Sequence, residues 1–263
     1  MSMAATILPF ERPMSVGEVL DAGITLFKAS LLRCLPLSLL AVIIGQLPSL
    51  VTMAQRRTPS LEGLGPLGWL LVIGAGLANV LLWGAILLRQ QAIAEGRRSP
   101  LAADLRRPLL RLPAALALIV LSALLIGAGV LALLLPGLYL IVALMFAYPA
   151  LLLDDESVVG ALRKSFLLVR GNWGRTSAIL TVALFAILVF YAIGMIAGLI
   201  VVQLMGGGDI GSVFLATTII GALIGALFTP FICALSLAQY ADLKLRRAGE
   251  DLARRIEALP SGT

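Results

Sequence analysis

The sequence predicts an all-α fold: a polytopic membrane helical bundle of six transmembrane helices with three cytoplasmic interfacial amphipathic helices. Of the 263 residues, 60% are hydrophobic and only 13% are charged, and the mean hydropathy is +1.04. Soluble domains contain about 45–50% apolar and about 25% charged residues, so this balance excludes a water-soluble domain and a disordered chain. The charges also lie in short segments between long uncharged stretches, and Lys and Arg gather on one side of these stretches.

Five stretches contain no charged residue, and each can hold at least one membrane helix. A bilayer core about 30 Å thick needs about 20 helical residues, and a charge inside it costs about 2.5–3.5 kcal/mol. The stretch Leu112–Leu153 has 42 residues and needs two helices, and Pro136-Gly137 predicts the turn between them. The predicted spans are Leu35–Met53, Leu67–Leu88, Pro113–Leu135, Leu138–Leu153, Ser177–Gln203 and Val213–Ala238.

The basic residues predict the orientation of these spans. Eighteen of the 20 Lys and Arg residues lie in the N-terminal segment, in the loops after spans 2 and 4, and in the C-terminal tail, whereas Arg56 and Arg57 lie on the other side. Cytoplasmic loops are enriched in Lys and Arg, so both termini are expected in the cytoplasm, with the chain in a bacterial inner membrane. The segment Met1–Ser15 has no continuous apolar run, so no cleaved signal peptide is expected.

A serine followed by an apolar helical stripe precedes each pair of spans. Ser15 and Glu18 have capping-box spacing, Ser99 precedes Pro100 at the first helical position, and Ser157 opens the third segment. Helices with one apolar and one charged face lie in the membrane interface. A single membrane domain (1–263) is therefore expected, with a tail (1–14), three units of interfacial helix plus hairpin (15–88, 99–153 and 157–238) and a C-terminal helix or tail (239–263).

The polar faces of these segments differ in sign. The first carries Glu18 and Asp21, whereas the second and third carry several Arg and Lys residues. One hypothesis is that the acidic helix packs beside a basic one, and the alternative is that all three faces meet water and lipid headgroups.

Several polar connections resemble one known bacterial family. They read LPGLYL at 135–140, YPAL at 148–151 and GALRKSFLLVRGNW at 160–173, with SVGEVLD at 15–21 and YADLKLRR at 240–247. This pattern resembles the glycerophosphoryl diester phosphodiesterase membrane domain family. The resemblance implies a membrane region of the kind that precedes a hydrolase domain in the name-giving proteins. It supplies no catalytic residues, and no hydrolase domain is recognised within these 263 residues.

The residues offer little for catalysis. There is no histidine, and the one acidic cluster, Asp154–Glu156, precedes the third amphipathic helix, where helix capping is favoured over a metal site. Cys34 and Cys233 are expected to pack in the core. We therefore expect no enzyme activity, no metal and no cofactor. The positive charge follows from topology, so no nucleic-acid partner is expected.

The preferred function is a non-catalytic, membrane-organising scaffold or regulatory module that engages anionic lipid, or a protein partner or second copy, at its basic cytoplasmic face. The alternative is a passive transporter of a lipid or small apolar solute, since the spans contain no charge for ion coupling. A lipid-sized cavity between the units would favour transport. The residues predicted to bind lipid headgroups are Arg106, Arg107, Arg163, Lys164, Arg170 and Arg175.

Overall fold

The computed structural model describes residues 7–8, 12–54, 65–204 and 210–257, and within these ranges the chain is helical and contains no strand. The all-α prediction is confirmed. The helices are α1 (Val16–Ala54), α2 (Pro66–Ala94), α3 (Leu101–Leu110), α4 (Leu112–Ala132), α5 (Leu134–Leu144), α6 (Ala147–Leu153), α7 (Val158–Val169), α8 (Trp173–Leu204) and α9 (Ile210–Glu257).

Six described segments are long and apolar enough to cross a membrane, as the sequence predicted. Each overlaps one predicted span, which makes the chain a multi-pass membrane protein by length and composition. These segments are Val16–Val51, Pro66–Ala94, Leu112–Ala132, Leu134–Leu153, Trp173–Leu204 and Ala216–Gly249.

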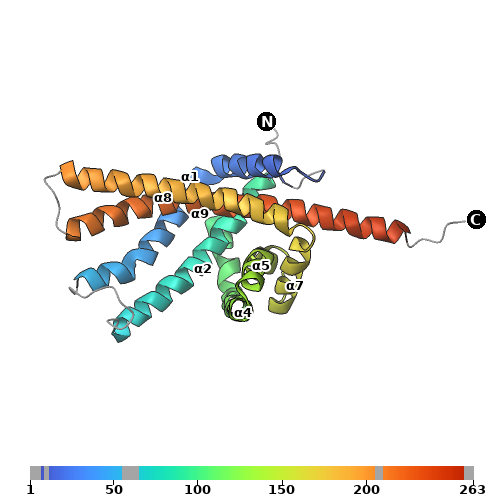
Figure 1. Cartoon of the computed structure of the whole chain (residues 1–263), viewed down its shortest axis with the longest axis horizontal. Helices are drawn as coiled ribbons and strands as arrows, with labels where there is room; N and C mark the ends of the chain where they lie inside the picture. The colour runs from blue at the N-terminus through green and yellow to red at the C-terminus, as the bar shows by residue number, and fades with distance from the viewer. Residues whose placement is uncertain (1–6, 9–11, 55–64, 205–209, 258–263) are drawn as a thin grey trace, which may run out of the picture.

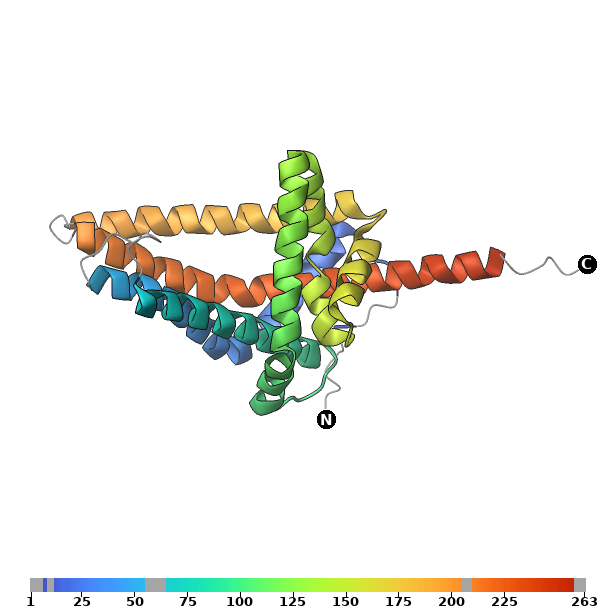
Figure 2. The same ribbon diagram turned by 90° about the horizontal axis from the view of Figure 1, so that it is seen from below.

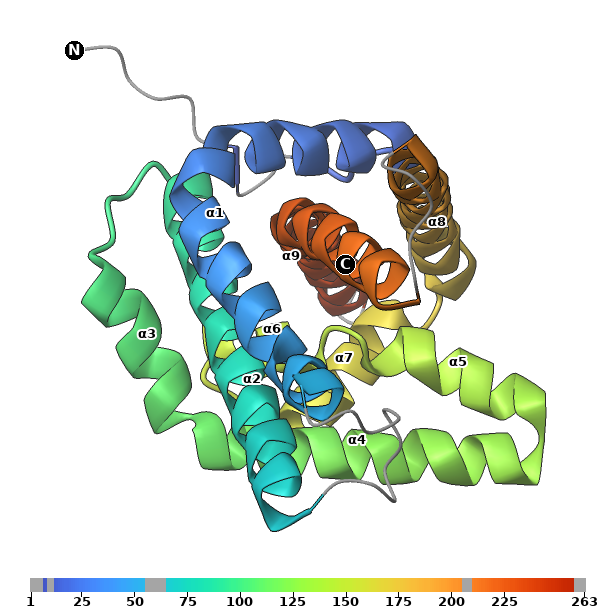
Figure 3. The same ribbon diagram turned by 90° about the vertical axis from the view of Figure 1, so that its left-hand side faces the viewer.

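The six segments do not all run in one direction. The second half of α1 extends with α2, α8 and α9 toward the same end of the molecule (Figure 1). At this end α1 and α2 form one pair of helices and α8 and α9 form another, and the two pairs splay apart. The α4–α5 hairpin lies crosswise to α8 and α9 (Figure 2). The first half of α1 also runs across the bundle (Figure 3). The C-terminal part of α9 projects beyond this crosswise layer on the side away from the splayed ends.

The first predicted amphipathic helix is not separate from the first span, because α1 is continuous from Val16 to Ala54. The axis of α1 bends between its first and second halves (Figure 3), and Pro36 lies inside the helix. A proline in a helix removes a backbone hydrogen bond and clashes with the preceding turn, so it bends the helix without ending it here. In the same way α9 continues past the predicted end of the last span as far as Glu257, with Pro230 inside it.

The serine caps are confirmed in two of the three segments. Ser15 Oγ accepts the Glu18 N–H (3.2 Å) while Glu18 Oε2 accepts the Ser15 N–H (2.6 Å), a complete capping box. Ser157 Oγ accepts the Gly160 N–H at 3.1 Å. The prediction for the second segment is one residue off, because Pro100 is the N-cap and α3 begins at Leu101.

The predicted turn at Pro136-Gly137 is wrong, because the chain reverses at Leu133, whose backbone is extended (φ −168°, ψ 142°). Pro136 lies in the first turn of α5, where its missing N–H costs no helical bond. A Cβ on Gly137 would lie 2.3 Å from Val130 Cγ2 and 2.8 Å from the Val130 backbone nitrogen. Gly137 is therefore needed for close packing of α5 on α4, and not for a turn.

The fourth predicted span is broken into α5 and α6 around Met145 and Phe146. The fully buried Ser165 of α7 bridges the break: its hydroxyl donates to the Ala143 carbonyl at 2.7 Å and accepts the Phe146 N–H at 3.1 Å. One side chain thus satisfies two backbone groups that a continuous helix would have paired internally.

Candidate anion-binding face

The acidic cluster Asp154–Glu156 joins α6 to α7 and forms ion pairs with cations from three helices and the α3–α4 junction. Asp154 contacts Lys164 and Lys244, each at 2.8 Å, and accepts the Tyr240 hydroxyl at 2.5 Å. Burial raises the pKa of Asp154, but these hydrogen bonds outweigh it and lower the pKa below its ordinary value. Glu156 contacts Lys164 at 3.0 Å.

Asp155 connects the cluster to the start of the second hairpin. It contacts Arg107 and Arg111, each at 2.8 Å. The Arg107 guanidinium lowers the pKa of this carboxyl group. Its positive φ of 55° is one that Asp tolerates better than most residues. The capping interpretation of the cluster is therefore wrong, because Ser157 makes the cap and the carboxylates bind cations.

A second cluster surrounds Asp242 of α9, whose side chain is almost fully buried. Its carboxylate accepts the Met14 N–H at 2.8 Å and contacts Arg175 at 3.1 Å and Arg246 at 2.9 Å. Arg246 also donates to the Met14 carbonyl at 2.6 Å. The cluster fastens the segment before α1 to α8 and α9. No local sequence pattern predicts this contact, since Met14 and Asp242 lie 228 residues apart.

The acidic face of the first helix does not pair with α3 or α7. Glu18 pairs at 2.5 Å with Arg12, in the segment just before α1. Asp21 is exposed, and no ion pair to it occurs within the described part of the chain. The hypothesis that this helix packs by charge beside a basic one is therefore not supported by any described ion pair.

The six predicted headgroup-binding residues separate into two groups. Arg107, Lys164 and Arg175 are engaged in the ion pairs above. Arg106 on α3, Arg163 on α7 and Arg170 at the end of α7 are exposed, and none forms an ion pair with another described residue. We call Arg106, Arg163 and Arg170 the free arginines. Asp155, just before α7, contacts both Arg107 of α3 and Arg111, so these contacts link α3 to α7. Two of the free arginines, Arg106 and Arg163, therefore lie on linked helices.

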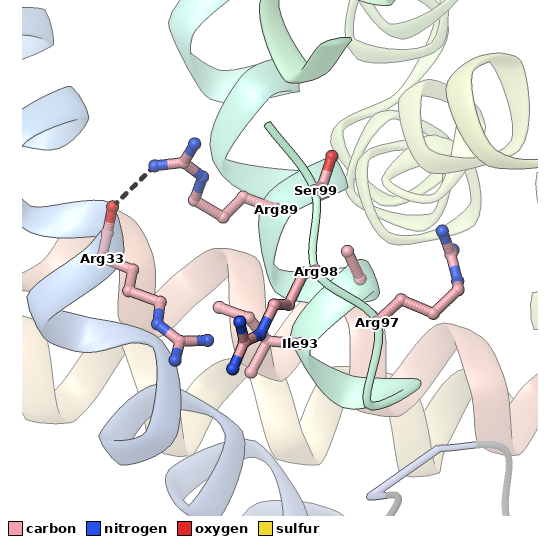
Figure 4. Close-up of a pocket in the computed structure, with 7 residues that line it drawn as sticks. Arg33, Arg89, Ile93, Arg97, Arg98 and Ser99 are labelled. Carbon is pink, nitrogen blue, oxygen red and sulfur yellow. Dashed lines mark hydrogen bonds between the residues drawn. The ribbon is translucent and has the colours of Figure 1, made fainter. Parts of the chain in front are cut away.

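A basic pocket that the sequence did not predict lies between α1, the end of α2 and the loop before α3. Its volume is about 270 Å³. Figure 4 shows the side chains of Arg33 and Arg98 turned toward the same space, with Arg97 turned away. The lining residues are Arg33, Arg89, Ala92, Ile93, Arg97, Arg98 and Ser99. We call this site the arginine pocket.

Two carboxylates position part of the arginine pocket. Arg89 donates from Nε to Asp104 at 2.9 Å and from Nη1 to the Arg33 carbonyl at 3.1 Å. Asp104 is buried and also accepts the Ser99 hydroxyl at 2.5 Å. Arg97 pairs with Glu95, while Arg33 and Arg98 have no ion-pair partner among the described residues. From the sequence these arginines predict only the orientation of the spans, because no local pattern shows that positions 33, 89 and 98 meet.

An apolar cleft of about 280 Å³ lies between the first and second predicted units. Asn79, Val80 and Trp83 of α2 line it with Ile119 of α4 and Tyr148 of α6. The Tyr148 hydroxyl donates to the Val80 carbonyl at 2.7 Å, and the Asn79 amide donates to the Ala75 carbonyl at 2.9 Å. Both polar tips are thus engaged by backbone, and the remaining lining is apolar.

A family model described as "Domain of unknown function (DUF7847)" matches residues 109–243, from the end of α3 into α9. The match covers just over half of the chain. No curated protein and no solved structure matches the chain. These comparisons do not link the chain to the glycerophosphoryl diester phosphodiesterase membrane domain family, so that resemblance stays a prediction from sequence.

Proposed function

We propose a membrane-organising role for this chain, which belongs to the DUF7847 family: a non-catalytic scaffold or regulatory module that binds anionic lipid at its basic face. The proposal places the protein in a bacterial inner membrane with both termini in the cytoplasm. The first half of α1, together with α3 and α7, would then lie at the cytoplasmic interface.

The observation that carries this proposal is a difference between acidic and basic side chains: seven described carboxylates are in ion pairs, whereas the free arginines are not. Seven of the described carboxylates are in ion pairs, namely those of Glu18, Glu95, Asp104, Asp154, Asp155, Glu156 and Asp242. The free arginines remain exposed without such a partner in the described part of the chain. An exposed guanidinium beside a bilayer attracts anionic headgroups, at about 1 kcal/mol for each cation. The carboxylates in ion pairs are engaged structurally, so the proposal needs no catalytic step.

The test compares lipid retention in purified protein. The triple variant R106Q/R163Q/R170Q should bind vesicles of phosphatidylglycerol and phosphatidylcholine more weakly than the wild type, by about fivefold for each lost charge. Binding to vesicles of phosphatidylcholine alone should not change. The variant R56Q/R57Q also lowers the positive charge, but in the segment predicted to lie on the other side of the membrane, and should retain binding. Equal binding by the triple variant and the wild type would refute the proposal.

Passive transport of a lipid or small apolar solute is a second candidate, favoured by the cleft between α2, α4 and α6. The cleft lies between two units and its lining is mainly apolar, as an acyl chain would require. Filling it with Ile119→Trp should slow the flux of a fluorescent phospholipid between leaflets of proteoliposomes. The conservative Ile119→Val variant should not. If the wild type gives no more flux than protein-free liposomes, the transport function is refuted.

A further inference from the structure

We propose that the arginine pocket is a specific site for one phosphate group. The inference deepens the proposed function, on which it rests, because it names the anionic chemistry that one part of the basic face recognises. The two ligand sources with this chemistry are a phospholipid headgroup and free phosphate.

Like charges converge in the arginine pocket. Arg33 and Arg98 turn toward the same space, and no carboxylate among the described residues pairs with either one (Figure 4). Guanidinium groups that share a small volume repel one another, and the repulsion strengthens beside apolar walls such as Ala92 and Ile93. An anion between the two guanidinium groups would turn this repulsion into attraction.

Arg89 is held in a fixed position at the pocket. Its Nε and Nη1 are held by Asp104 and by the Arg33 carbonyl, and the exposed fraction of its side chain is only 17%. Its Nη2 has no hydrogen bond to a described residue. Asp104 therefore compensates part of the charge of Arg89 and orients it, and does not close the pocket. A donor held in this way loses little freedom when a ligand binds.

The size of the pocket and the directions of its arginines indicate the shape of the ligand. The pocket volume of about 270 Å³ lies just below the range of about 300–1,000 Å³ that is usual for sites that bind small molecules. It has room for a single phosphate group. A phosphate presents oxygens in several directions and can accept from three guanidinium groups that approach from different elements, whereas a carboxylate presents only two oxygens.

The location favours a lipid over a soluble ligand. Arg33 lies in α1 just before Pro36, and Arg89 lies within two turns of the end of α2, so both are at the boundary between apolar helix and charged connection. A headgroup phosphate occupies the same depth in a bilayer. Phosphatidylglycerol is therefore the first probe and inorganic phosphate the second.

The experiment measures binding of each probe to the delipidated full chain in detergent, by native mass spectrometry for the lipid and by calorimetry for inorganic phosphate. The wild type should take up phosphatidylglycerol at one saturable site. The variant R33Q/R98Q should bind it about 100-fold more weakly, or about tenfold for each charge-assisted bond lost. The variant R12Q/K28Q, which loses the same charge elsewhere, should bind as the wild type does.

A conservative variant keeps the test decisive if R33Q/R98Q does not fold. R33K/R98K retains both charges but loses the planar fork, so it should bind more weakly than the wild type. Saturable binding of inorganic phosphate that R33Q/R98Q loses would support the pocket with a free anion as its ligand. Equal binding of both probes by the wild type and both pocket variants would overturn the inference.

The two proposals fail in different ways. If the pocket variants retain their saturable site while R106Q/R163Q/R170Q loses vesicle binding, the phosphate pocket is wrong and the lipid-binding face stands. If the pocket variants lose the site while the triple variant binds vesicles normally, the pocket stands and the wider lipid-binding face is wrong.

Discussion

Ser165 offers a sharp test of how the break between α5 and α6 is stabilised. Its hydroxyl is fully buried, donates to the Ala143 carbonyl at 2.7 Å and accepts the Phe146 N–H at 3.1 Å. In Ser165→Ala both backbone groups stay buried and lose their partner. A buried group left unsatisfied costs about 1–3 kcal/mol, so the two together should lower the free energy of unfolding by about 2–6 kcal/mol.

The measurement is reversible unfolding in mixed micelles, followed by circular dichroism. The matched control is Ser177→Ala, because the Ser177 hydroxyl donates at 2.9 Å to the Gly174 carbonyl of its own helix at an exposed site. Its loss should change the free energy of unfolding by less than about 0.5 kcal/mol. If Ser165→Ala were as stable as this control, the break would not depend on the hydroxyl bridge, and the account of α5 and α6 would be wrong.

Three further predictions concern charge and packing. The pKa of Asp155 is lowered in the folded chain, so its ion pairs stabilise the fold above its unfolded pKa of about 4 and lose this effect as the pH falls through the lower folded value. The melting temperature should therefore fall below about pH 4, and should fall less in Asp155→Asn. Gly137→Ala should lower the melting temperature, because the new Cβ would lie 2.3 Å from a Val130 methyl group, whereas Gly127→Ala, with nothing within 4 Å, should not. Asp242→Asn should release the segment before α1 to added protease, while the exposed Asp21→Asn should leave it protected.

Features set by neighbouring residues could be predicted from the sequence. The capping box of Ser15 and Glu18, the cap at Ser157 and the number of apolar segments all follow from spacing or composition. The turn between α4 and α5 could not, because Pro136-Gly137 is typical of a turn and only the contact with Val130 shows why the glycine is there. Local patterns do not contain the distance between two packed helices.

The candidate site depends even more on contacts between helices that local sequence patterns do not predict. The sequence shows where cations are abundant, but which of them are neutralised depends on carboxylates brought in by the fold. Lys164 and Arg175 match the free arginines in sequence context, yet Asp154 and Asp242 engage them. Arg33 and Arg89 are 56 residues apart and meet only because α1 packs along α2.

The crosswise α4–α5 hairpin sets how many of the six apolar segments cross the bilayer. α4 has 21 residues and would be about 32 Å long, but α5 has 11 and reaches only about 16 Å, about half of the hydrocarbon core. The hairpin enters after Arg111 and leaves before Asp154, so both ends lie on one side whether or not it crosses. The orientation of the other helices is the same in both cases.

The tip of this hairpin is apolar on all sides. Leu131 and Leu133 have exposed fractions of 90% and 70%, which favours hydrocarbon around them at about 25 cal/mol for each Å² buried. Because the hairpin lies across α8 and α9 (Figure 2), we expect its tip to stay within one leaflet, which is the cytoplasmic one in the proposed orientation. Leu133→Cys should therefore resist a membrane-impermeant maleimide added from either side, with the buried Cys34 and Cys233 as a silent background. Labelling from the outer side alone would show that the hairpin crosses and that its crosswise placement does not persist in the bilayer.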